Sequence, residues 1–221
     1  MNILVVSATH FEIQPLLDFL DIKEPMPGIN TTKINRASVH IEVLITGIGM
    51  VETAFMMGKC MNKSYHLIIN VGVCGAFNKL LKLGELVCVT QDILSELGAE
   101  DDTNFLPYNQ LSLPGEYIFS SVFSRLFPDI DQLKKVIGIT VNTIHGNEIS
   151  INKIQQLYHP DVESMEGAAF FRACQELNVP YIQIRAISNY VEKRDKSKWQ
   201  MPLAIKNLND FLIRFIKETS N

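Results

Sequence analysis

Leu67-Ile68-Ile69-Asn70-Val71 is a short, mostly apolar run, and the stretch Gly72-Val73-Cys74-Gly75 follows it directly. Apolar residues at successive rather than alternate positions are typical of a strand that is buried on both faces of a sheet. Comparable runs, rich in β-prone residues, occur at Ile3–Val6, Val39–Ile45, Leu86–Val89, Val136–Val141 and Tyr181–Ile187. We therefore expect a sheet whose central strands are covered on both sides.

Segments with helical periodicity separate these runs. They lie at Glu12–Leu20, Val51–Met61, Ile151–Tyr158, Met165–Leu177 and Met201–Lys217. Strands that alternate with helices predict an α/β fold, here a single domain over residues 1–221 with a mixed, mainly parallel central β-sheet flanked by helices. Two long segments, Gln91–Gly115 and Asn189–Gln200, are predicted as loops, and long loops in such a domain are usually functional or mobile.

The composition argues against several classes of partner. The chain has 221 residues, a net charge of −4 and a pI near 5.7, and its Lys and Arg residues are scattered, so we expect no nucleic-acid partner. No run approaches the roughly 18 apolar residues of a membrane span, and the apolar start lacks the basic flank of a signal peptide. We therefore expect a cytoplasmic protein without a membrane partner. The four cysteines show no metal-binding spacing, so no metal is expected. We expect no organic cofactor either.

Polar residues lie at the ends of several predicted strands, where open α/β sheets bind their ligands. Glu12, Arg185 and Asn189 are such residues. Each also has a purely structural interpretation, because helix dipoles favour carboxylates in the first turn, buried arginines form ion pairs and asparagines favour turns. The turn Gly47-Ile48-Gly49 resembles the start of a dinucleotide-binding turn, but Glu52 occupies the place of the third glycine, which disfavours a nicotinamide-nucleotide site.

Five ordered motifs resemble those of the nucleoside phosphorylase and nucleosidase superfamily over the whole length of the chain. They are the first strand with Glu12, Ile45–Gly49, Ile69–Ala76, Val162–Ala168 and Arg185–Asn189. Three further stretches are similar to those of the futalosine hydrolases, enzymes of the alternative menaquinone route: Glu96–Asp101, Val162–Gly167 and Ile187–Glu192. The resemblance implies an enzyme that cleaves the N-glycosidic bond of a nucleoside.

The resemblance also implies roles for particular residues. Glu12 would engage the attacking water, with Arg185 in support. Glu166 would hold the ribose hydroxyls, because an ionised carboxylate is purely an acceptor, and Met165 would lie against the sugar. Val73, Gly75 and Phe105 would also contact the substrate.

Two positions distinguish hydrolysis from phosphorolysis. Hexameric phosphorylases of the superfamily bind phosphate with an arginine and a serine where this chain has Asn70 and Val73, and the first loop, Ser7–Phe11, contains no arginine. A phosphate dianion would lack charge-assisted partners other than Arg185. We therefore expect water as the nucleophile.

Asn189 occupies the position at which adenine-specific nucleosidases of the superfamily have an aspartate. Its amide can donate to O6 of a 6-oxopurine and accept from a protonated N7, so hypoxanthine is the expected base. The resemblance thus implies hydrolysis of futalosine to hypoxanthine and dehypoxanthine futalosine. The alternatives are a 5′-methylthioadenosine/S-adenosylhomocysteine nucleosidase, a purine nucleoside phosphorylase and a non-catalytic nucleoside-binding module.

The 5′ substituent of futalosine is an aromatic carboxylate, which requires an apolar slot and a polar or cationic end. Candidate residues are Phe77, Phe105, Arg194, Lys196 and Trp199, although surface solvation alone would explain the two cations. Members of the superfamily are usually oligomers in which a neighbouring subunit closes the pocket, so we expect a homo-oligomer, at least a dimer.

Overall fold

Eleven strands and six α-helices make up the part of the chain that the computed structural model describes, residues 1–23, 28–33, 39–61, 64–122, 128–177 and 179–219. The strands are β1 (Asn2–Ser7), β2 (Gly28–Lys33), β3 (His40–Ile45), β4 (Leu67–Ala76), β5 (Leu86–Leu94), β6 (Gly98–Asp101), β7 (Asn104–Pro107), β8 (Ile118–Ser120), β9 (Lys134–Thr140), β10 (Val162–Ser164) and β11 (Tyr181–Tyr190). The helices are α1 (Gln14–Phe19), α2 (Met50–Cys60), α3 (Pro128–Asp131), α4 (Glu148–Tyr158), α5 (Gly167–Gln175) and α6 (Met201–Thr219).

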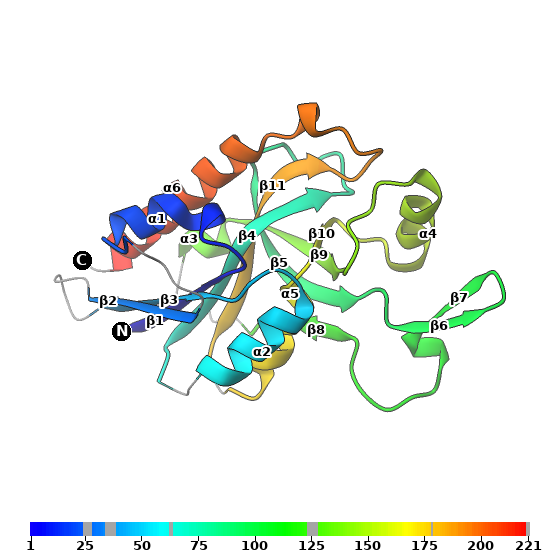
Figure 1. The fold of residues 1–221 in the computed structure, drawn as a ribbon, viewed down its shortest axis with the longest axis horizontal. Coiled ribbons are helices and arrows are strands. Elements are labelled where there is room, and N and C mark those ends of the chain that lie inside the picture. The colour runs from blue at the N-terminus through cyan, green and yellow to red at the C-terminus, as the bar shows by residue number, and fades with distance from the viewer. Residues whose placement is uncertain (24–27, 34–38, 62–63, 123–127, 178, 220–221) are drawn as a thin grey trace.

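Helices cover both faces of the central sheet, as the sequence predicts. Helices α1 and α6 lie on one face, and α2 and α5 lie on the other (Figure 1). Strand β1 contributes to both cores because successive side chains point to opposite faces: Ile3 and Val5 pack in the cluster that includes residues of α1 and α6, whereas Leu4 and Val6 pack in the cluster that includes residues of α2 and α5. This double burial explains why the strand reads as a continuous apolar run.

The sheet is mixed, and part of it closes on itself. Its order is β10-β9-β5-β11-β4-β1-β3-β2, with β8 paired to β5. Strands β1, β3, β4 and β11 form a parallel set, and β5 runs antiparallel to β11. Strand β10 pairs with β9 and also, antiparallel, with β4, so that β4, β11, β5, β9 and β10 form a closed ring. The closure brings the ends of β4, β10 and β11 close to one another.

The predicted loop Gln91–Gly115 is largely wrong. Strand β5 continues to Leu94, and β6 and β7 form a two-stranded hairpin that projects from the body of the domain (Figure 1). The short strands β2, β8 and β10 were also not predicted. Strands β8 and β10 pair with β5 and β4, which are distant in the sequence, whereas β2 pairs with the next strand, β3. Each has only three to six residues, which carry little periodicity of their own.

Two other strands extend beyond their predicted ends. Strand β4 continues through Gly72 and Gly75 to Ala76, and β11 continues to Tyr190. The glycine stretch is therefore part of a strand rather than a turn. Within the described residues, no helix has the length and apolarity that crossing a membrane requires.

Candidate active site

A cavity of about 260 Å³ lies at the carboxyl ends of β1, β10 and β11, beside the last third of β4. Most of the predicted site residues contribute to its wall: Glu12, Val73, Gly75, Met165, Glu166 and Asn189. They come from segments up to 177 residues apart (189 − 12), which the closure of the sheet brings together. The geometry thus unites the predicted residues in one place, while their chemical roles stay predictions.

The carboxylate of Glu12 is held by three hydrogen bonds. Its Oε1 accepts from the backbone N–H of Val73 at 3.0 Å, and Oε2 accepts from the backbone N–H and the hydroxyl of Thr9 at 3.2 and 2.9 Å. Burial raises the pKa of Glu12 above its ordinary value, whereas the bond from Val73 and the charge of Arg185 oppose that rise. A fixed carboxylate with a raised pKa is suited to accept a proton.

Arg185 lies behind the cavity wall and is almost completely buried. Its Nη2 donates to Oδ1 of Asn70 at 2.6 Å and lies 3.6 Å from Oε2 of Glu166. A side chain at Gly72 would collide with Nη1 of Arg185 and lie 2.8 Å from Oε1 of Glu12, so the glycine is what allows these two groups to approach the strand. Arg185 therefore forms the ion pair that is expected of a buried arginine, and its partner, Glu166, is itself a predicted site residue.

Glu166 precedes α5 and faces the cavity rather than its own helix. Its Oε1 accepts from the backbone N–H of Gly49 at 3.1 Å. Gly47 and Gly49 have φ angles of 91° and 93°, in the region that favours glycine, so this turn depends on both residues. The backbone N–H of Gly49 is thus used to hold the carboxylate of Glu166.

Asn189 reaches the cavity because β11 contains a bulge. The register against β4 shifts between Ile187 and Asn189, and the consecutive residues Ser188 and Asn189 both line the cavity. Nδ2 of Asn189 donates to the carbonyl of Tyr190 at 3.0 Å, and Oδ1 lies 2.8 Å from the Ser188 hydroxyl, whose one proton it shares with the carbonyl of Cys74 at 3.1 Å. Since a backbone carbonyl only accepts, the amide orientation is defined. One N–H and one lone pair remain for a ligand.

The charges around the cavity are unbalanced. Glu12, Glu163 and Glu166 line it, and among the described residues no Lys or Arg does so. Glu163 is fully buried and accepts from Nδ1 of His145 at 2.6 Å. The cavity wall therefore attracts cationic character and disfavours anions.

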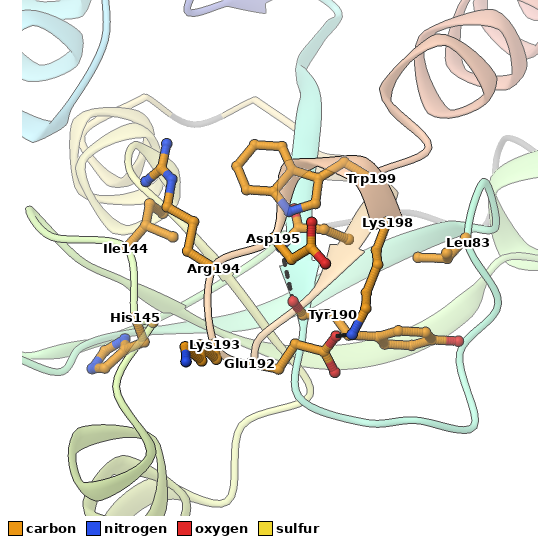
Figure 2. A pocket seen from close by; sticks show the side chains of 12 residues that line it. Leu83, Ile144, His145, Tyr190, Glu192, Lys193, Arg194, Asp195, Lys198 and Trp199 are labelled. Carbon is orange, nitrogen blue, oxygen red and sulfur yellow. Dashed lines mark hydrogen bonds and ion pairs between the residues drawn. The ribbon is translucent and has the colours of Figure 1, made fainter.

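Several residues proposed for the 5′ substituent lie elsewhere. Phe105, on β7, lines a separate cavity that includes Lys153, and Phe77 is buried in the core beside His145. Trp199 does line the main cavity, and it also borders a neighbouring cavity in which the guanidinium of Arg194 lies 5.3 Å from its ring centroid (Figure 2). Of the candidates, Trp199 is thus the one that the chain brings to Glu12.

One supporting residue was not predicted. Asn209, on the buried face of α6, donates from Nδ2 to the carbonyl of Glu12 at 2.9 Å and accepts the backbone N–H of Leu16 at 3.0 Å. It therefore fixes the segment that carries Glu12. The available signal was a single amide among the apolar residues of an amphipathic helix, between Leu208 and Leu212.

Comparison with known proteins extends over almost the whole chain. The model of the phosphorylase superfamily matches residues 2–217. The chain is 26% identical over 213 residues to the futalosine hydrolase of Acidothermus cellulolyticus, covering 93% of this chain and 86% of that protein. It is 29% identical over 183 residues to the futalosine hydrolase of Thermus thermophilus, covering 79% and 80%.

A solved structure confirms the fold. The 5′-methylthioadenosine/S-adenosylhomocysteine nucleosidase of Helicobacter pylori matches with a TM-score of 0.82 at 19% sequence identity, covering 99% of this chain and 98% of that chain. The two chains therefore share their arrangement of strands and helices, but a shared fold does not imply a shared substrate. With a family match that spans residues 2–217, this protein belongs to the phosphorylase superfamily.

Proposed function

We propose that this protein hydrolyses the N-glycosidic bond of a 6-oxopurine nucleoside and that futalosine is its substrate. The observation that carries the proposal is the cavity wall, where the described residues present three carboxylates and no Lys or Arg. A phosphate dianion would be repelled there, whereas a sugar with oxocarbenium character would be stabilised. The names of the two curated relatives support futalosine as the substrate.

The reaction requires a water at C1′ of the ribose, on the side opposite the base. Glu12 orients this water and accepts its proton as the C1′–N9 bond breaks and the C1′–O bond forms. Glu166 accepts hydrogen bonds from the ribose hydroxyls, and Met165 packs against the sugar. Arg185, tied to Asn70, stays behind the two glutamates and limits the cost of holding both as anions.

The departing base is stabilised at its O6 and N7 edge. N7 takes a proton from solvent as the C1′–N9 bond breaks, and Glu12 later returns the proton of the water to solvent. The free N–H of Asn189 donates to O6, and its remaining lone pair accepts from the new N7–H. Adenine presents an amino group where hypoxanthine presents O6, so its donor would face the donor of Asn189. This mismatch favours the 6-oxopurine.

Product analysis tests the proposal directly. We expect futalosine to release hypoxanthine and free sugar at the same rate with and without phosphate, because the cavity offers phosphate no cationic ligand. Chromatography of released base and sugar, with inosine and 5′-methylthioadenosine as comparison substrates, measures this. A sugar 1-phosphate product would identify a phosphorylase, and release of adenine alone would identify the alternative nucleosidase.

Replacement of Glu12 by glutamine retains the size of the side chain and removes its charge. We expect kcat to fall at least about a hundredfold, the low end for loss of a general base, while nucleoside binding persists. Since burial raises the pKa of Glu12, the wild-type kcat/KM should fall with decreasing pH already above pH 4.5, and this decline should be absent in Glu12→Gln. Glu85→Gln, outside the cavity, is the control. Normal turnover by Glu12→Gln would show that another group is the base.

Asn189→Asp changes the donors at the base edge and nearly preserves its shape. We expect the 6-oxopurine reaction to slow by about a hundredfold to a thousandfold, because one preorganised donor is lost, and the preference to shift toward adenine. The measurement is kcat/KM for matched inosine-type and adenosine-type substrates. Asn207→Asp is the matched control, since Asn207 also donates to a backbone carbonyl, that of Gly84, but lies outside the cavity. An unchanged ratio would mean that the base is recognised elsewhere.

We further propose that the protein acts as a homo-oligomer. Four large apolar side chains near the cavity are 61–77% exposed: Phe11, Ile48, Val51 and Phe55. Phe11 and Ile48 also line the cavity itself. A second copy on this apolar surface would cover it and complete the open side of the cavity, where the 5′ substituent has few partners.

Light scattering after size-exclusion chromatography measures the mass in solution. We expect at least a dimer for the wild type and a smaller species for Phe55→Glu, because a charge would be buried in the interface. Leu80→Glu serves as the control at an exposed leucine outside this surface. A monomeric wild type at assay concentration would contradict the proposal.

A further inference from the structure

Helix α5 does not use the residue in front of it as a cap. A Ser, Thr, Asp or Asn side chain at the N-cap position ordinarily accepts from the N–H of the second or third helical residue. Glu166 holds this position, but its side chain makes no such bond. It reaches instead to Gly49 and toward Arg185, at the cavity.

Thr140, at the end of β9, supplies the missing acceptor. Its Oγ1 accepts from the backbone N–H of Ala168, the second residue of α5, at 2.8 Å. The same hydroxyl donates its single proton to Oδ1 of Asp92 at 2.6 Å. Because the carboxylate takes this proton, the lone pairs of the hydroxyl stay directed to the helix.

The carboxylate of Asp92 occupies a position built for it. It is completely buried on β5, and Oδ2 accepts from Nε2 of Gln183 at 3.1 Å. A side chain at Gly167 would collide with Oδ2, and a Cβ at Gly138 would lie 3.0 Å from it. Two glycines thus leave room for one buried carboxylate beside the first turn of a nine-residue helix, where the dipole favours an anion.

Burial is nevertheless costly for this group. It raises the pKa of Asp92 to about 6, while the bonds from Thr140 and Gln183 and the charge of Arg185 oppose the rise and the charge of Glu166 adds to it. Asp92 does not line the cavity, so it has no direct part in the proposed chemistry. A completely buried carboxylate outside the cavity, held by hydrogen bonds from Thr140 and Gln183, points to an indirect role.

We propose that Thr140 and Asp92 are positioning residues for the ribose: they cap α5 in place of Glu166 and thereby leave that carboxylate free to bind the two ribose hydroxyls. The inference rests on the proposed function, which gives Glu166 its ribose contact. Without Thr140, the first turn of α5 would lose this acceptor. Glu166, which directly precedes that turn, would then lose the fixed position from which it reaches the sugar.

The test compares a nucleoside with its free base, because only the nucleoside has a ribose. Binding of futalosine and hypoxanthine, and of 5′-methylthioadenosine and adenine, is measured by calorimetry in Glu12→Gln, in which cleavage is expected to be at least about a hundredfold slower. In this background, Thr140→Val should weaken the affinity for whichever nucleoside binds by about tenfold, the range of losing a helix cap. The affinity for the corresponding free base should change less than twofold. Thr140→Ser should restore binding, since it restores the hydroxyl.

Two further variants separate the possible results. Asp92→Asn keeps an acceptor for the Thr140 hydroxyl and should weaken nucleoside binding less than Thr140→Val does. Glu166→Gln alone should weaken nucleoside binding, and adding Thr140→Val to it should reduce the affinity little further. Equal loss of nucleoside and base in Thr140→Val, or no loss, would overturn the capping role. No effect of Glu166→Gln would instead overturn the ribose contact in the proposed function.

Discussion

The buried guanidinium of Arg185 holds the candidate site together. It lies within a sheet that offers little water, so it requires partners, and it finds them in Asn70 and Glu166. Gly72 leaves space for it beside Glu12. One cation that does not itself line the cavity therefore pairs with Glu166 and lowers the pKa of Glu12 against the effect of burial.

The closed part of the sheet determines which segments meet around that cation. A purely parallel sheet would leave β10 at an edge, whereas here β10 pairs with both β9 and β4. Glu163 and the segment leading to Glu166 are thereby brought opposite Asn189. The bulge in β11 places the consecutive residues Ser188 and Asn189 in the wall of the same cavity.

The sequence predicted what depends on local pattern. The long strands were found as continuous apolar runs, and the helices were found by their periodicity. Glu12 and Asn189 follow predicted apolar runs, Arg185 lies inside one, and the resemblance to the superfamily gave all three their expected roles. Strand β10 was missed because its pairing with β4 is formed across the fold. The hairpin β6–β7 is a local pairing, but its two strands have four residues each, too few to show a clear period. Asn209, Thr140 and Asp92 act through hydrogen bonds to distant backbone groups, and no spacing along the chain reveals such contacts.

The absence of Lys and Arg from the described cavity wall also has a consequence for how a ligand enters. Futalosine, the proposed substrate, carries a carboxylate on its 5′ substituent, and the three glutamates would repel that group as they would repel phosphate. Under the proposed function, the wall would therefore favour entry of the neutral base and sugar first and would leave the charged end of the nucleoside pointing outward.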